Sequence, residues 1–74
     1  MKKYFTNCQL EGTPQAKVTS VLKNGACTAT VISGKDTGLD KVMFTADISS
    51  LPKRGDIIIL QSIQRTGGGG SGLF

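Results

Sequence analysis

Few side chains in this chain could carry out acid–base, nucleophilic or metal chemistry. There is no histidine, so the Ser-His and Cys-His pairs that activate nucleophiles are excluded. No spacing pairs two carboxylates, and Cys8 and Cys27 lack the close pairing of zinc ligands. The acidic residues are Glu11, Asp36, Asp40, Asp47 and Asp56. We therefore expect a protein that is not an enzyme and that uses no metal or other cofactor.

Positive charge is the stronger chemical signal. Nine Lys and Arg residues stand against five acidic ones, which gives a net charge of +4 and favours anionic partners such as nucleic acid. The alternative is that this charge only maintains solubility, as it does in many small domains. Single-strand-binding proteins combine cations that contact phosphates with aromatic rings that stack on bases. The candidate phosphate contacts are Lys17, Lys23, Lys53, Arg54 and Arg65, and Tyr4 or Phe5 is the candidate stacking ring.

The elements that must position these side chains read as β-strands. Asn24-Gly25 lies between two alternating runs, which predicts a hairpin with a two-residue turn. That turn would place Leu22 opposite Cys27 and Val18 opposite Val31. The predicted core face of this hairpin comprises Val18, Leu22, Cys27, Ala29 and Val31. The predicted outer face comprises Lys17, Thr19, Val21, Lys23, Thr28, Thr30 and Ile32.

Three further strands are expected, at residues 3–10, 41–48 and 56–65. In the first, Tyr4 and Phe5 point to opposite faces, and in the second, Val42, Phe44, Ala46 and Ile48 share one apolar face. In the last of these, residues 57–60 are apolar on both faces, which suits a strand buried centrally or at an interface. A turn over residues 49–55, with at most one short helical piece, is expected between the strands at 41–48 and 56–65. Five short strands predict an all-β fold, a small five-stranded OB-like or SH3-like barrel spanning residues 1–66.

Residues 67–74 form a separate glycine-rich tail, which we expect to be flexible. Its sequence suits a natural tether, and it also matches a common engineered linker. Leu73 and Phe74 end it and are candidate contacts for a protein partner. The alternative function is accordingly a protein-interaction or phage structural module that uses the apolar last strand and these two residues.

Residues 41–65, KVMFTADISSLPKRGDIIILQSIQR, resemble the C-terminal half of the filamentous-phage single-stranded-DNA-binding proteins of the gene V type. In both, an apolar strand leads through a Pro/Gly turn into a second apolar strand. The resemblance implies an OB-like barrel, an obligate dimer, and cooperative coating of single-stranded DNA during viral replication. The tail is similar to that of bacterial single-stranded-DNA-binding proteins, which also ends in a phenylalanine that docks on partners.

Size and cysteine usage bear on assembly and location. A chain this short buries only about 60% of the surface it exposes when unfolded, so a homodimer or higher oligomer is expected. No apolar run is long enough to span a membrane, and the first residues do not form a secretion signal. We expect a cytoplasmic protein, in the host if phage-encoded, with Cys8 and Cys27 reduced; a disulfide between them is the alternative.

Overall fold

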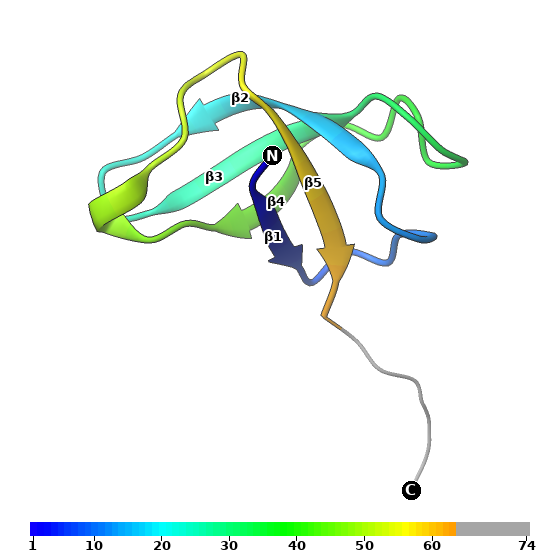
Figure 1. The fold of residues 1–74 in the computed structure, drawn as a ribbon, viewed down its shortest axis with the longest axis horizontal. Helices are drawn as coiled ribbons and strands as arrows, with labels where there is room; N and C mark the ends of the chain where they lie inside the picture. Colours follow the sequence, from blue (N-terminus) through cyan, green and yellow to red (C-terminus); the bar gives the residue numbers. More distant parts are fainter. Residues whose placement is uncertain (64–74) are drawn as a thin grey trace, which may run out of the picture.

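The computed structural model describes residues 1–63, which form five strands and one short 3-10 helix (Figure 1). The strands are β1 (Lys3–Thr6), β2 (Gln15–Val21), β3 (Ala26–Val31), β4 (Val42–Thr45) and β5 (Ile57–Ser62), and the helix is η1 (Ile48–Ser50). The predicted tail at residues 67–74 lies outside the described residues.

The five strands close into a barrel in the order β1-β4-β3-β2-β5. The consecutive strands β2, β3 and β4 form an antiparallel meander. The last strand, β5, then lies between β2, to which it is antiparallel, and β1, to which it is parallel. Within residues 1–63, each strand is therefore paired with a neighbour on both sides. The prediction of an all-β, five-stranded barrel is therefore confirmed.

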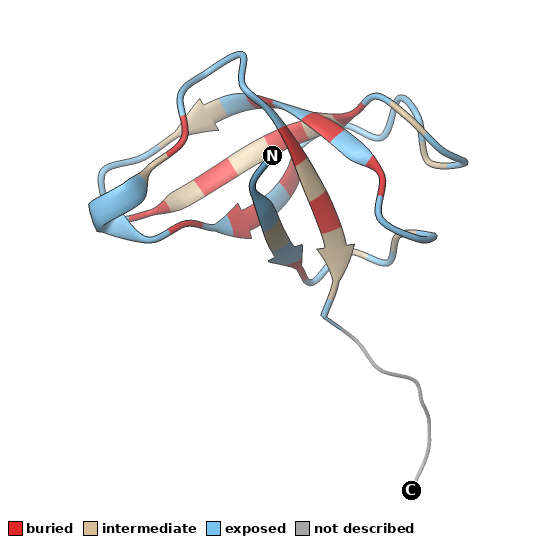
Figure 2. Ribbon diagram, viewed as in Figure 1, coloured by how far each residue is buried: buried red, intermediate tan, exposed pale blue. Residues whose placement is uncertain are grey.

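The core follows the alternation of side chains along each strand (Figure 2). The inward residues of β3 and β4 are buried as predicted, and Ile58 and Leu60 of β5 join them. The buried apolar residues are Ala16, Val18, Cys27, Ala29, Val31, Val42, Phe44, Ala46, Ile58 and Leu60. Cys27 is a buried free thiol, and Cys8 is a half-buried one.

Two predicted strands are shorter than expected. The first strand ends at Thr6 instead of residue 10, because Ser62 Oγ accepts a hydrogen bond from Leu10 N at 2.6 Å and donates one to Cys8 O at 2.8 Å. These side-chain contacts replace strand pairing. The fourth strand ends at Thr45, and Ile48, predicted to share a strand face with Val42 and Phe44, lies in η1 with 66% of its surface exposed.

The register predicted for the β2–β3 hairpin is wrong. Leu22 N donates to Ala26 O at 2.9 Å and Gly25 N donates to Leu22 O at 3.0 Å, so the loop holds three residues instead of two. A bulge between Val18 and Ser20 shifts the pairing again, and Val18 lies opposite Ala29. The bulge reverses the alternation, because it adds one residue to one strand only.

As a consequence, two side chains exchange faces. Val21, predicted to point outward, packs against the core, and Leu22, predicted to point inward, is 55% exposed. The inward positions on β3 are unaffected, because the bulge lies in β2.

The carboxylate of Asp40 links the end of the loop before β4 to β3. Its Oδ1 accepts hydrogen bonds from Thr30 Oγ1 at 2.6 Å and from Lys41 N at 2.8 Å. The Thr30 bond, followed by the Lys41 backbone bond, lowers the pKa of Asp40. This contribution to stability is present above the ordinary carboxyl pKa and is lost as the pH falls through the lowered, folded-state value.

We expect the substitution Thr30→Val to raise the pKa of Asp40 towards its ordinary value, because the largest cause of the shift is removed. An NMR pH titration of the Asp40 carboxyl carbon measures this pKa in both proteins. Thr28→Val, on the same strand but with its hydroxyl bonded to Thr19, is the matched control and should leave the pKa of Asp40 unchanged. An Asp40 pKa that does not move in the variant would contradict the assignment.

Candidate nucleic-acid interface

Strands β2, β5 and β1 lie side by side and present one continuous outer surface (Figure 1). Lys17 of β2 is paired with Ile57, and Lys3 of β1 is paired with Ile59. Phe5 follows Lys3 on the same face, because its neighbours Tyr4 and Thr6 point inward. We call this surface the β2–β5–β1 outer face; it comprises Lys3, Phe5, Lys17, Ile57 and Ile59.

A tight turn over residues 53–56 adds two cations at one end of this face. Asp56 Oδ2 accepts a hydrogen bond from the backbone N of the first turn residue at 2.9 Å. Gly55 N donates to Val18 O at 2.7 Å, and Val18 N donates to Asp56 O at 2.9 Å, so the turn is fastened to the residue next to Lys17. The fold thus brings together three of the predicted phosphate contacts: Lys17, Lys53 and Arg54.

Lys23, another predicted phosphate contact, does not join this group. Lys23 lies in the loop of the β2–β3 hairpin, about 20 Å further along the strand from Lys17. That loop is fastened to the η1 end of the barrel, where Ala46 N donates to Gly25 O at 2.8 Å. The other predicted contacts, Arg65, Leu73 and Phe74, lie outside the described residues.

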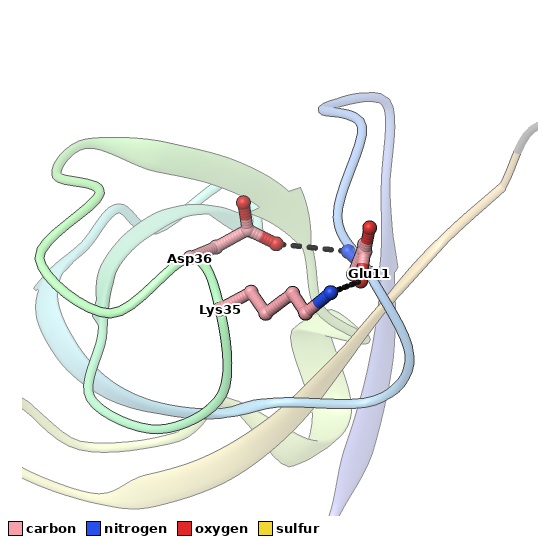
Figure 3. A network of polar contacts seen from close by, with 3 residues as sticks. All are labelled: Glu11, Lys35 and Asp36. Carbon is pink, nitrogen blue, oxygen red and sulfur yellow. Dashed lines mark hydrogen bonds and ion pairs between the residues drawn. The ribbon is translucent and has the colours of Figure 1, made fainter.

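Acidic side chains gather at the opposite end of the barrel, in the loops before β2 and before β4. Asp36 Oδ2 accepts a hydrogen bond from Glu11 N at 2.8 Å, and Lys35 Nζ lies 3.6 Å from Glu11 Oε1 (Figure 3). With Asp40 and Lys41, these loops hold three acidic and two basic residues. The rest of residues 1–63 holds six basic and two acidic residues, so the excess positive charge lies on the part that includes the outer face.

A groove opens between β1 and β4, where the described strands form a single residue pair, Thr6 with Phe44. Beyond that pair the two strands separate and leave a space of about 400 Å³. We call it the β1–β4 groove; it is lined by residues 3–7 of β1 and its end, Ala26 and Cys27 of β3, residues 43–45 of β4, and Ile63.

The two candidate stacking rings occupy different environments. Tyr4 points inward, and its ring centroid lies 4.8 Å from that of Phe44, at an angle of 36°. The Tyr4 hydroxyl is buried and has no hydrogen-bond partner among residues 1–63. Burial is the main cause that raises the pKa of Tyr4, followed by the nearby Cys27 thiol. Phe5 is 55% exposed, so it is the ring that a base can reach on the outer face.

We expect the substitution Tyr4→Phe to stabilise the barrel by about 1 kcal/mol at neutral pH, because a buried hydroxyl without a partner is removed. The raised pKa of Tyr4 also makes the stability of the wild-type protein depend on pH. The wild-type protein should keep its full stability below the ordinary tyrosine pKa of 10.0 and lose part of it as the pH rises through the folded-state value. The variant should lack this loss.

Urea unfolding followed by circular dichroism at neutral and alkaline pH measures both effects. Lysine deprotonation affects the two proteins equally, so it cancels in the comparison. A destabilised Tyr4→Phe variant would show that the hydroxyl has a partner in solution.

Sequence reasoning left two residues out of the candidate site. Lys3 lies on the outer face beside Phe5, and the alternation along residues 3–6 was a signal that could have placed it there. Met43, which is 66% exposed at the rim of the groove, had no such signal. Met43 lines the groove only because β1 and β4 separate beside it.

Comparison of the chain with protein-family models, with curated proteins and with solved structures gives no match. Within residues 1–63, no helix has the length and apolar character needed to cross a membrane. The geometry and the charge of the site are therefore what indicate its function.

Proposed function

We propose that this protein binds single-stranded nucleic acid on the β2–β5–β1 outer face. One observation carries the proposal: the turn at residues 53–56 is fastened beside Lys17, at one end of a face that also presents Lys3 and the exposed ring of Phe5. A row of cations that ends beside an exposed aromatic ring suits a sequence-tolerant single-strand site. The resemblance of residues 41–65 to the phage single-stranded-DNA-binding family supports the same proposal. We propose that the protein acts in the cytoplasm.

In this proposal the cations neutralise consecutive phosphates, and a base stacks on Phe5. The apolar side chains Ile57 and Ile59 lie between the flanking lysines and offer contact surface to sugars and bases. Affinity then comes mainly from counterion release, so it should fall steeply with salt.

Fluorescence anisotropy of a labelled oligothymidylate at rising salt concentration tests the proposal. Two cations on the face and two in the turn at its end predict a slope of about −3 for the logarithm of the binding constant against that of salt concentration, at about −0.7 per phosphate. No binding at low salt would end the proposal. Binding indifferent to salt would remove its electrostatic basis.

A second candidate function, assembly with another protein or with a second copy of this chain, has its own observation. Leu22 and Ile48 are 55% and 66% exposed. They lie at the same end of the barrel, because the hairpin loop is fastened to Ala46 and Gly25 lies against the Ile48 side chain. Two exposed large apolar side chains at one end are a suitable centre for a small interface.

We expect the wild-type protein to form a homodimer through this end and Leu22→Ser to shift it to monomer. Analytical ultracentrifugation over a tenfold concentration range measures the distribution. The control is Leu39→Ser, since Leu39 is also exposed but lies in the loop before β4. A wild-type monomer at all concentrations, or equal loss in both variants, would contradict this interface.

A further inference from the structure

The seam between β1 and β4 is the least closed part of the barrel. One strand pair joins the two strands, and beyond it Lys2 Nζ donates a hydrogen bond to Ser50 Oγ at 2.6 Å across the gap. A second depression of about 240 Å³ lies at this end and shares Lys3 and Tyr4 with the β1–β4 groove. The two hollows therefore lie next to each other along β1.

The groove has the chemical character of a site for a flat, aromatic ligand with polar edges. The rings of Tyr4 and Phe44 lie together in its wall, and the Met43 thioether lies at its rim. Asn7 and Thr45 supply exposed polar side chains beside them. The space is also within the range of about 300–1,000 Å³ that small-ligand pockets occupy.

An unsatisfied polar atom lies in the same wall. The Tyr4 hydroxyl is buried without a hydrogen-bond partner among the described residues, a state that native structures seldom leave uncompensated. A ligand with hydrogen-bonding groups on its edge would satisfy it as the seam opens. An aliphatic side chain would fill the space and leave the hydroxyl without a partner.

The position of the β1–β4 groove beside the β2–β5–β1 outer face indicates which ligand the groove receives. Lys3 and Phe5 belong to the β2–β5–β1 outer face and also line the groove, so a strand that follows the face passes its mouth. We propose that the β1–β4 groove receives one unstacked base of the bound nucleic acid, against Tyr4, while Lys3 holds the adjoining phosphate. This inference rests on the proposed function and adds to it a site that takes the base itself.

The chain provides its own reporter for this site. Tyr4 is the single tyrosine and there is no tryptophan, so tyrosine emission reports on the groove alone. The probes are an oligothymidylate and an abasic oligonucleotide of equal length. We expect both to raise the anisotropy, because both carry phosphates. Only the oligothymidylate should quench Tyr4 emission, after correction for its absorbance with free tyrosine amide.

A pair of variants locates the effect. Met43→Ala removes apolar surface at the rim of the groove and should weaken the quenching interaction about tenfold, as loss of a good base contact does. Leu39→Ala removes another exposed apolar side chain, which lies in the loop before β4 and does not line the groove, and should change nothing. Circular dichroism establishes that both variants are folded.

The outcomes separate the two proposals. Equal anisotropy with no Tyr4 quenching would overturn the base site and leave the outer face standing. If no oligonucleotide binds, the proposed function fails, and uncharged thymidine then tests the groove alone: quenching supports the base site, and its absence overturns it. A change in Tyr4 emission on deleting residues 64–74, without any nucleotide, would assign the groove to the chain's own C-terminal segment and overturn the proposal.

Discussion

Replacing Lys17, Lys53 and Arg54 together by glutamine should lower the affinity for a single-stranded oligonucleotide on the order of 100-fold at low salt. The reason is their convergence: the turn at residues 53–56 is fastened to Val18, so the three cations act on neighbouring phosphates. The slope of the logarithm of the binding constant against that of salt concentration should also become shallower by about 2, because about 0.7 is lost with each phosphate contact. Fluorescence anisotropy titrations at several salt concentrations measure both quantities.

The matched control lies at the opposite end of the barrel. Lys35→Gln combined with Lys41→Gln removes two exposed charges from the loop that holds Asp36 and Asp40. This variant should keep its affinity within about threefold, since these lysines are next to acidic side chains and away from the outer face. If the control lost as much affinity per charge as the triple variant, net charge alone would explain binding, and the outer face would not be a site.

Gly25→Ala should destabilise the barrel by about 3 kcal/mol, from backbone strain and steric overlap together. Gly25 has a φ of +95°, a region that side chains with a Cβ rarely adopt. A Cβ at this position would lie 2.5 Å from Ala46 O, which is backbone and cannot rotate away. Moving the hairpin loop away from the end of β4 would also lengthen the hydrogen bond from Ala46 N to Gly25 O. Urea unfolding by circular dichroism measures the loss.

Gly38→Ala separates the two causes. Gly38 has nearly the same φ, +97°, but no atom lies within 4 Å of a Cβ built there. This variant should therefore lose only the backbone term, about 1 kcal/mol. Equal losses at the two positions would show that the contact with Ala46 has no energetic effect and that the loop is not held tightly against the end of β4.

The predictions that held depend on alternation within a strand. The β3 positions Cys27, Ala29 and Val31 and the β4 positions Val42 and Phe44 were assigned to the core from a period of two, and all are buried. This period is a property of the extended backbone, so it can be read without knowing which strands pair.

The hairpin register failed for a physical reason of a different kind. Asn24-Gly25 marked the turn correctly, but only Gly25 has a positive φ, so the two-residue turn that needs positive φ at both positions does not form. The bulge after Val18 has no distinctive residue of its own. Because the prediction included neither the three-residue loop nor the bulge, it assigned Leu22 and Val21 to the wrong faces of the hairpin.

The candidate site, like the fold, was predicted from the sequence only in part. Sequence by itself identified a basic chain, the five strands and most of the cations. It also indicated that Tyr4 and Phe5 point to opposite sides of one strand, and their burial now shows which ring is inside.

Only the tertiary structure decided that Lys17 joins the turn at residues 53–56, that Lys23 lies apart, and that Lys3 shares a face with Lys17 across β5. Each of these follows from pairing between strands that are distant in the chain, above all the parallel closure of β1 on β5. Local residue patterns cannot specify such pairings, because many closures satisfy the same alternation. The β1–β4 groove arises from the same source: it exists because this closure leaves those two strands joined at a single residue pair in the described part of the chain.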